Sequence, residues 1–184
     1  MKNLKMMALA LTTIFILNSC SNDDSPVVEE ELITTLTATF VGGGQTITLT
    51  SRDADGDDPN DPVITVSGNF APSTTYTGSV QFLNELENPA ENITEEIEEK
   101  DLEHQIFYQI SNSLGSFTYA DFDSDGNPLG LAFTFTTGAN PGTGSLTIIL
   151  RHLLNKNAAG VAEGDISNAG GSTDVEASFP VVVE

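Results

Sequence analysis

Cysteine and tryptophan are almost absent from this chain of 184 residues, which has one cysteine, Cys20, and no tryptophan. A single cysteine forms no disulfide within the chain, so the stability has to come from the hydrophobic core, for which about 150 residues suffice. Without tryptophan, and with only three tyrosines, the chain has little material for the exposed aromatic platforms on which carbohydrate-binding β-sandwiches usually rely. Carbohydrate binding is therefore not the function that we expect.

Motifs of common enzyme classes are missing as well. The chain has no Gly-x-Ser-x-Gly elbow for a nucleophilic serine and no phosphate-binding glycine loop followed by a helix. Gly42-Gly43-Gly44 lies between two expected strands, where we predict a hairpin turn. We do not expect an enzyme, although the many carboxylates leave glycoside hydrolysis open.

Basic residues are scarce, since six Lys and Arg stand against 27 Asp and Glu, which gives a net charge of -21. Nucleic acid is excluded as a partner, because binding a polyanion requires Lys and Arg to neutralise its phosphates. Anionic lipid headgroups would repel the domain for the same reason. Cations are the small partners that such a surface attracts.

Long hydrophobic runs are limited to Met6 to Leu17, which is too short to span a bilayer. This run follows a short basic start, so residues 1–19 have the pattern of a secretory signal peptide. Leu17-Asn18-Ser19-Cys20 resembles the lipobox of bacterial lipoproteins, which implies cleavage before Cys20 and lipidation of its thiol. The alternative is a plain secretory signal followed by a free cysteine. A lipidated Cys20 would hold the mature chain on a membrane through its acyl chains.

Residues 20–31 form a polar, acidic stretch without hydrophobic periodicity, and we interpret it as a tether. Removal of the signal peptide takes away Lys2 and Lys5, so the charge of the mature chain becomes -23. Asp23-Asp24 resembles the acidic export signal of surface lipoproteins in the Bacteroidota. We expect an outer-membrane location, with the surface and the periplasmic face both open.

From residue 32 to residue 184 the chain repeats short runs rich in Thr, Val, Ile and Phe, separated by clusters of Gly, Asn, Asp or Pro. This pattern predicts a single all-β domain, an antiparallel two-sheet β-sandwich of the immunoglobulin or fibronectin kind. Alternation places Ile47 and Leu49 inward in one strand, and Leu146, Ile148 and Leu150 inward in another. The expected strands are Leu32–Phe40, Gln45–Arg52, Val63–Phe70, Thr75–Asn84, His104–Ser111, Ser116–Ala120, Leu131–Thr136, Ser145–Leu153 and Thr173–Val183.

Residues 92–100 depart from the β pattern. Ile93 and Ile97 are spaced i, i+4, and Asn92 is of a type favoured as an N-cap. This spacing predicts one short helix across an end of the sandwich, with its glutamates in water.

Two acidic loops have the composition of calcium sites, because carboxylates at alternate positions before a glycine can wrap around one ion. The first offers Asp121, Asp123, Asp125 and Asn127, and the second offers Asp53, Asp55 and Asp57. The first resembles half of a calcium-binding loop, but its twelfth position is Ala132 in place of a bidentate glutamate. Solvated turns are the alternative for both loops.

The two histidines each end an apolar row. His104 shares a strand face with Ile106 and Tyr108, and His152 shares one with Leu150. If these strands are antiparallel neighbours, the imidazoles lie at the same end of the sandwich. Together with Glu99, Asp101 or Glu103 they could bind Zn²⁺ or another transition metal, or hold a haem iron between them. A hydrogen-bonded histidine at the edge of the core is the ordinary alternative.

Four segments resemble small Bacteroidota lipoproteins that are named type 1 periplasmic binding fold superfamily proteins. The segments are Tyr76–Glu85 (YTGSVQFLNE), Glu103–Tyr108 (EHQIFY), Asp125–Leu131 (DGNPLGL) and Leu150–His152 (LRH). The resemblance implies nutrient capture beside an outer-membrane uptake receptor. The family name implies two α/β lobes, whereas the strand pattern of this chain predicts a β-sandwich.

These observations favour a lipid-anchored binding or accessory module of the outer membrane, with calcium at the acidic loops as an expected cation. One alternative is a transition-metal or haem-binding lipoprotein that uses His104 and His152. The other is a structural or interaction lipoprotein with no small ligand.

Overall fold

The computed structural model describes residues 31–56 and 60–184. The expected signal peptide, the lipobox with Cys20 and most of the tether lie outside these residues, as does Asp57 of the second acidic loop. In chain order the elements are β1 (Thr35–Gly42), β2 (Gln45–Arg52), β3 (Val63–Val66), β4 (Thr75–Leu83), α1 (Ile93–Glu99), β5 (His104–Ile110), β6 (Gly115–Tyr119), β7 (Ala132–Thr137), β8 (Gly142–His152), the 3₁₀ turn η1 (Ile166–Asn168) and β9 (Ser172–Val183).

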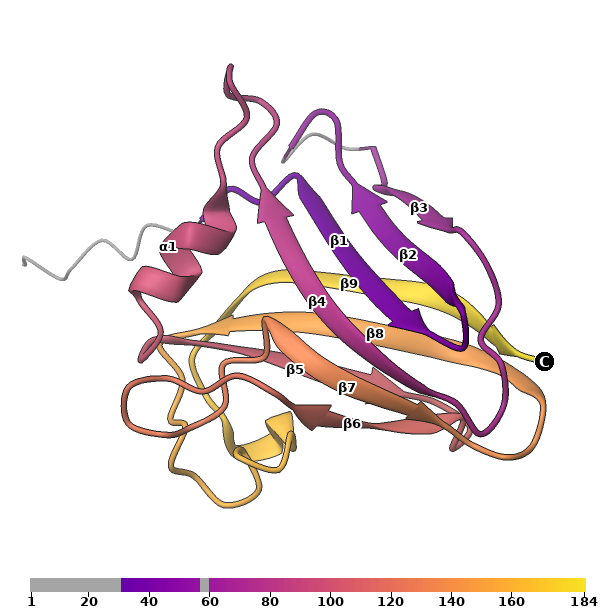
Figure 1. Ribbon diagram of the computed structural model, residues 1–184. Coiled ribbons are helices and arrows are strands. Elements are labelled where there is room, and N and C mark those ends of the chain that lie inside the picture. Colours follow the sequence, from indigo (N-terminus) through magenta and orange to yellow (C-terminus); the bar gives the residue numbers. More distant parts are fainter. Residues whose placement is uncertain (1–30, 57–59) are drawn as a thin grey trace, which may run out of the picture.

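The strands form two antiparallel sheets that face each other (Figure 1). One sheet has six strands in the order β3-β2-β1-β4-β7-β6, and the other has three in the order β5-β8-β9. The predicted two-sheet architecture with one short α-helix is therefore confirmed for the described residues. Gly43 and Gly44 join β1 to β2, and φ is positive at both, as a tight two-residue hairpin turn requires.

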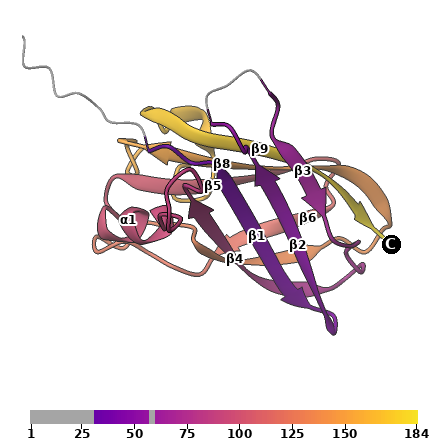
Figure 2. The same ribbon diagram turned by 90° about the horizontal axis from the view of Figure 1, so that it is seen from above.

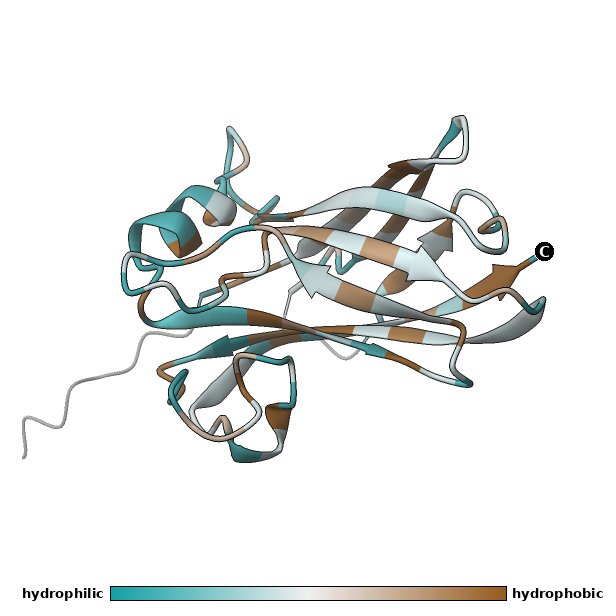
Figure 3. Ribbon diagram, turned by 60° about the horizontal axis from the view of Figure 1, so that its bottom comes forward, coloured by the Kyte–Doolittle hydropathy of each residue, from teal (hydrophilic) through white to brown (hydrophobic). Residues whose placement is uncertain are grey.

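The core lies between the sheets and is rich in phenylalanine. Phe40 contacts Phe70 and Phe133 edge-on, with ring centroids 5.1 Å apart in both pairs, and all three rings are buried. Full burial of a side chain of this size contributes about 1.5–3 kcal/mol, and edge-on packing adds to it. The residues predicted to point inward, Ile47, Leu49, Leu146, Ile148 and Leu150, are all buried. Figure 3 shows the resulting alternation of apolar and polar bands along the strands.

A long connection between β8 and β9 covers the outer face of the three-stranded sheet. This outer loop, residues 153–171, packs Val161 and Ala169 against Phe107 and Ile149, and all four side chains are buried. Strand β5 is consequently buried on both faces from His104 to Phe107. A sheet buried on both faces has no clean alternation of apolar and polar residues.

Helix α1 lies at the end of the sandwich away from the C-terminus (Figures 1 and 2). Its predicted inward residues, Ile93 and Ile97, are buried. The side chain of Asn92 precedes the helix without capping it: its Oδ1 accepts no N–H group of the helix, and its amide donates a hydrogen bond to Glu95 Oε1 at 2.8 Å. No helix in the described part of the chain has the length and apolar character that a membrane crossing requires.

The edge strand β3 is shorter than expected and ends at Val66. Beyond it the chain leaves the edge of the six-stranded sheet, and Phe70 forms an isolated parallel bridge to Val183 of the other sheet. Phe70 is thereby buried in the core, although it does not belong to a strand. An apolar side chain can therefore enter the core from a connection between the two sheets.

Candidate metal centre

The two histidines of the chain lie side by side at one end of the three-stranded sheet. Strands β5 and β8 pair antiparallel, and the register sets His104 directly opposite His152. Their imidazole planes are 12° apart in angle, and the ring centroids are separated by 4.6 Å. The prediction that both histidines occupy the same end of the sandwich is confirmed.

A β-bulge in β9 brings a carboxylate to the same place. Leu150 of β8 pairs with Val175, but the next residue, Arg151, pairs with Thr173, so that Asp174 is the additional residue of the bulge. Further along β9, regular alternation leaves Glu176 exposed. The bulge breaks this alternation, as bulges do when they redirect a side chain, and the Asp174 side chain is fully buried.

The cluster places one ligand atom from each of His104, His152 and Asp174 within 4.8 Å of one another. His104 Nε2 lies 3.7 Å from Asp174 Oδ2, and His152 Nδ1 lies 3.8 Å from Asp174 Oδ1. Both distances exceed that of a hydrogen bond. The two nitrogens are buried and make no hydrogen bond to any atom of residues 31–56 or 60–184.

The other nitrogen of each ring, here called the outer nitrogen, faces an oxygen acceptor: these are His104 Nδ1 and His152 Nε2. The acceptor determines the tautomer of each neutral ring. His104 Nδ1 lies 3.1 Å from the carbonyl oxygen of Lys100, which accepts only, so Nδ1 carries the hydrogen. His152 Nε2 faces the carboxylate of Glu103 at 3.5 Å. A neutral imidazole whose outer nitrogen is held in this way presents a lone pair on the inner nitrogen. Both inner lone pairs then point to the place where the Asp174 carboxylate lies.

Burial keeps His104 in its neutral form. The pKa of His104 is lowered from 6.5 to about 4, mainly by desolvation of the ring; the hydrogen bond to Lys100 acts against this shift, and the neighbouring His152 adds to it. At neutral pH a metal ion would not have to displace a proton from this ring, because metals bind the neutral imidazole.

The arrangement fits a transition-metal ion. Nitrogen and oxygen ligands about 2.0–2.2 Å from Zn²⁺ lie roughly 3.4 Å apart at a tetrahedral angle. The two nitrogen-to-oxygen distances in the cluster are 3.7 and 3.8 Å, so small side-chain rotations would close them around an ion. A carbonyl or a carboxylate on the outer nitrogen is the usual support of a metal-binding histidine.

The geometry gives no support to haem. An iron held between two axial imidazoles needs the rings on opposite faces of the macrocycle. The rings of His104 and His152 are nearly parallel with centroids 4.6 Å apart, and no macrocycle fits between them. Among the carboxylates expected nearby, Glu103 contacts His152, whereas Asp101 accepts a hydrogen bond from the backbone of Ser124.

Asp174 was missed by the sequence interpretation, although it lies within a predicted strand. Strict alternation from Ala177 and Phe179 back along β9 assigns position 174 to the outer face. The available signal was an acidic residue directly before Val175, and an acidic residue is ordinary on the outer face of a strand. A bulge cannot be deduced from that signal alone, because it depends on the partner strand.

The ammonium group of Lys156 lies against the Asp121 loop. Asp123 Oδ2 accepts a hydrogen bond from Lys156 Nζ at 2.9 Å, and both side chains are buried. The same ammonium donates to the carbonyls of Asp101, at 2.6 Å, and Pro128, at 3.1 Å. Desolvation raises the pKa of Asp123, but the Lys156 ammonium and the backbone N–H groups of Asn127 and Asp125 together outweigh it, so the net shift of the pKa is downward. Three oxygens thus surround a lysine ammonium beside the loop where the sequence predicts calcium.

The other oxygens of this loop mostly organise its backbone. Asp123 Oδ1 accepts the backbone N–H groups of Asp125 and Asn127, and Asp121 Oδ1 accepts that of Gly130. In the second loop Asp53 Oδ1 accepts the N–H groups of Asp55 and Gly56. Among the described residues neither loop forms a cluster of three candidate ligands, and calcium at the loops stays a prediction.

Comparisons with known proteins do not assign this chain to a family. No protein-family model matches the chain, and neither a curated protein nor a solved structure is significantly similar to it.

Proposed function

We propose that this protein is a metal-binding module of the cell envelope that holds one divalent transition-metal ion, with Zn²⁺ as the first candidate. The ligands would be His104 Nε2, His152 Nδ1 and a carboxylate oxygen of Asp174. The observation that carries the proposal is the convergence of two buried imidazole nitrogens, both without a hydrogen bond among the described residues, on one carboxylate. A cation between them would compensate for their burial.

The donor set favours a transition metal over calcium at this centre. Imidazole nitrogen suits Zn²⁺, Cu²⁺, Fe²⁺ and Ni²⁺, whereas Ca²⁺ takes oxygen ligands almost exclusively. Three protein ligands leave a fourth position for water or for a group from a partner. Glu103, whose side chain is about half exposed at 49%, lies on the solvent side of His152 and marks the direction from which an ion would enter.

The setting of the site suits capture or storage of an ion better than catalysis. His104 is fully buried and His152 is 6% exposed, so a bound ion would be held firmly and would offer little access to a substrate. The net charge of -21 would raise the local concentration of cations. In the same proposal, Cys20 anchors the module at the outer membrane, where metal capture beside an uptake receptor fits the N-terminal sequence. The lipobox motif supports this location.

Elemental analysis of the purified full-length chain tests the proposal. After dialysis against equal traces of Zn²⁺ and Ca²⁺, we expect close to one zinc per chain in the wild type and none in Asp174→Asn. Asparagine keeps the shape of the side chain and removes the anionic ligand. The control is Glu176→Gln, the same charge change on an exposed residue of β9, which should retain its zinc.

Two results would contradict the proposal. A wild-type chain without zinc, copper, iron or nickel would reduce the cluster to a buried histidine and aspartate network with a structural role. Equal zinc in the wild type and in Asp174→Asn would place the ion elsewhere. Imidazole NMR signals provide the second measurement, because metal binding turns the rings out of their parallel stack and moves both sets of signals.

A further inference from the structure

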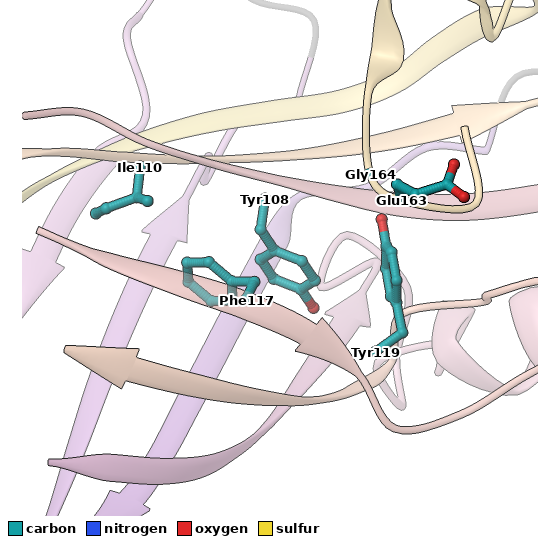
Figure 4. A pocket seen from close by; sticks show the side chains of 6 residues that line it. All are labelled: Tyr108, Ile110, Phe117, Tyr119, Glu163 and Gly164. Carbon is teal, nitrogen blue, oxygen red and sulfur yellow. The ribbon is translucent and has the colours of Figure 1, made fainter. Parts of the chain in front are cut away.

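A cavity of about 180 Å³ lies between the edge strands of the two sheets, apart from the histidine cluster. It opens between β5 and β6, and the outer loop closes one side of it (Figure 4). Its lining residues are Tyr108, Ile110, Phe117, Tyr119, Glu163 and Gly164. Figure 4 shows Ile110 at one end of the cavity and Glu163 at the other, over Tyr119.

The polar atoms of the two tyrosines are already engaged. The Tyr108 hydroxyl donates to the carbonyl of Gly130, and the Tyr119 hydroxyl donates to the carbonyl of Ile106 at 2.9 Å. Gln105 Nε2 donates to the Tyr119 hydroxyl at 3.2 Å. Burial raises the pKa of Tyr119 to about 12 and that of Tyr108 well above its ordinary value. Both phenols are therefore neutral and offer mainly ring surface to a ligand.

Glu163 supplies the one charged group of the lining. Its backbone N–H is bonded to the carbonyl of Gly160, which fixes its place on the outer loop. Its carboxylate makes no hydrogen bond or ion pair with another residue in the described part of the chain. Gln105 holds this part of the loop through a hydrogen bond from Nε2 to the carbonyl of Val161, at 2.9 Å. The cavity thus combines apolar ring surface with an exposed carboxylate at its rim.

We propose that this cavity binds a small organic ammonium ion with an apolar body. The apolar body would lie against Ile110, Tyr119 and the edge of the Phe117 ring, and the ammonium group would pair with the Glu163 carboxylate at the rim. The net negative charge of the protein favours any cationic ligand.

A sugar fits this cavity less well. Phe117 is stacked between Tyr108 and Phe135, with centroid distances of 4.7 and 4.5 Å, so neither of its faces is free as a platform. The hydroxyls of both tyrosines have their partners within the protein, which leaves few groups for the many hydroxyls of a carbohydrate. An ammonium ion needs one anionic partner, and Glu163 provides it.

Calorimetric titration of the full-length chain tests the assignment, with benzylammonium as the probe and benzyl alcohol as its neutral counterpart. We expect saturable binding of benzylammonium and at least tenfold weaker binding of the alcohol. Glu163→Gln should weaken benzylammonium binding by about two- to fivefold, because one exposed ion pair is lost. The control is Glu87→Gln, the same charge change on an exposed residue of the loop before α1, which should bind like the wild type.

Two outcomes would overturn the assignment. Equal affinity for the amine and the alcohol would show that the carboxylate plays no part in recognition. Equal losses in Glu163→Gln and Glu87→Gln would show that only the overall charge attracts the amine. The result is independent of the metal centre, because Asp174→Asn should bind benzylammonium as the wild type does.

Discussion

The imidazoles of His104 and His152 lie nearly parallel with their centroids 4.6 Å apart, and each holds an outer partner while turning its inner nitrogen toward Asp174. Lys100, at the end of α1, provides the partner of His104, and Glu103 faces His152. Helix α1, strand β5 and strand β8 therefore position the two rings together.

The first prediction concerns Glu103, the carboxylate on the outer nitrogen of His152. Replacement of such an outer partner typically weakens metal affinity by about 10–100-fold. We expect Glu103→Gln to weaken zinc binding by this factor, measured by competition with a coloured chelator. Glu99→Gln changes the same charge at an exposed position of α1 and should leave the affinity unchanged. Equal affinities in both variants would show that Glu103 does not support His152.

The second prediction concerns protonation of His104 in metal-free protein prepared with a chelator. Its pKa is lowered to about 4 in the folded chain, while the unfolded chain protonates near 6.5. Between these values the unfolded state binds more protons, so this residue makes the free energy of unfolding fall as the pH falls from 6.5 to 4. The contribution is on the order of 3 kcal/mol.

Urea denaturation of the chelated protein across this pH range checks the effect. The wild type should lose more stability than His104→Gln between pH 6.5 and pH 4. An imidazole NMR titration gives a direct second measurement, with a midpoint for His104 near 4. A midpoint at or above 6.5 would contradict the burial effect.

The third prediction concerns the buried pair of Lys156 and Asp123. Removing one member of a buried ion pair leaves an uncompensated charge, which costs about 3–5 kcal/mol. We expect this loss for Lys156→Met in urea denaturation. Lys100 is half exposed in its pairs with Glu31 and Glu96, so Lys100→Met should cost less than about 1 kcal/mol. Similar losses in the two methionine variants would argue against a special role for Lys156.

A second variant separates charge from packing at the same pair. Asp123→Asn combined with Lys156→Met removes both charges, while the amide oxygen can still accept the N–H groups of Asp125 and Asn127. The double variant should be more stable than Lys156→Met alone. Calcium binding, followed by calorimetry, should be stronger in Lys156→Met than in the wild type, because the ammonium no longer competes for Asp123.

The fourth prediction concerns two neighbouring glycines that end the outer loop. Gly170 and Gly171 both have positive φ, 64° and 70°, but they differ in surroundings. A Cβ on Gly170 meets nothing within 4 Å, whereas one on Gly171 would come within 2.2 Å of the carbonyl oxygen of His152. Gly170→Ala should cost about 1–2 kcal/mol for its backbone conformation, and Gly171→Ala clearly more. Equal losses in thermal or urea unfolding would contradict the close approach.

Much of the fold was predictable because β-strands alternate locally. The inward rows of Ile47 and Leu49 and of Leu146, Ile148 and Leu150 follow from a period of two, which needs no knowledge of partner strands. The helix followed from the spacing of Ile93 and Ile97 in the same way. Asn92 shows the limit of such local reasoning, since it stands at the N-cap position but its side chain does not cap the helix.

The candidate metal centre was only partly predictable. His104 and His152 are the only histidines, and each ends an inward row, so their shared end followed once their strands were assumed to pair. Asp174 did not follow, because the bulge that turns it inward arises from the pairing of β8 with β9. Lys156 also gave no sequence signal, because the carboxylate that it neutralises lies on a distant loop.

The all-β class, the short helix, the side of the sheet on which each histidine lies and the strong negative charge could all be read from the sequence. These properties depend on composition and on residues that are close in the chain. Four contacts became visible only in the folded chain: the pairing of β5 with β8, the place of Asp174 beside the histidines, the lysine ammonium beside the Asp121 loop and Glu163 at the rim of an aromatic cavity. Each of these contacts joins residues that are far apart in the chain. They form because strand pairing fixes the register and because the packing of the core decides which side chains are buried together.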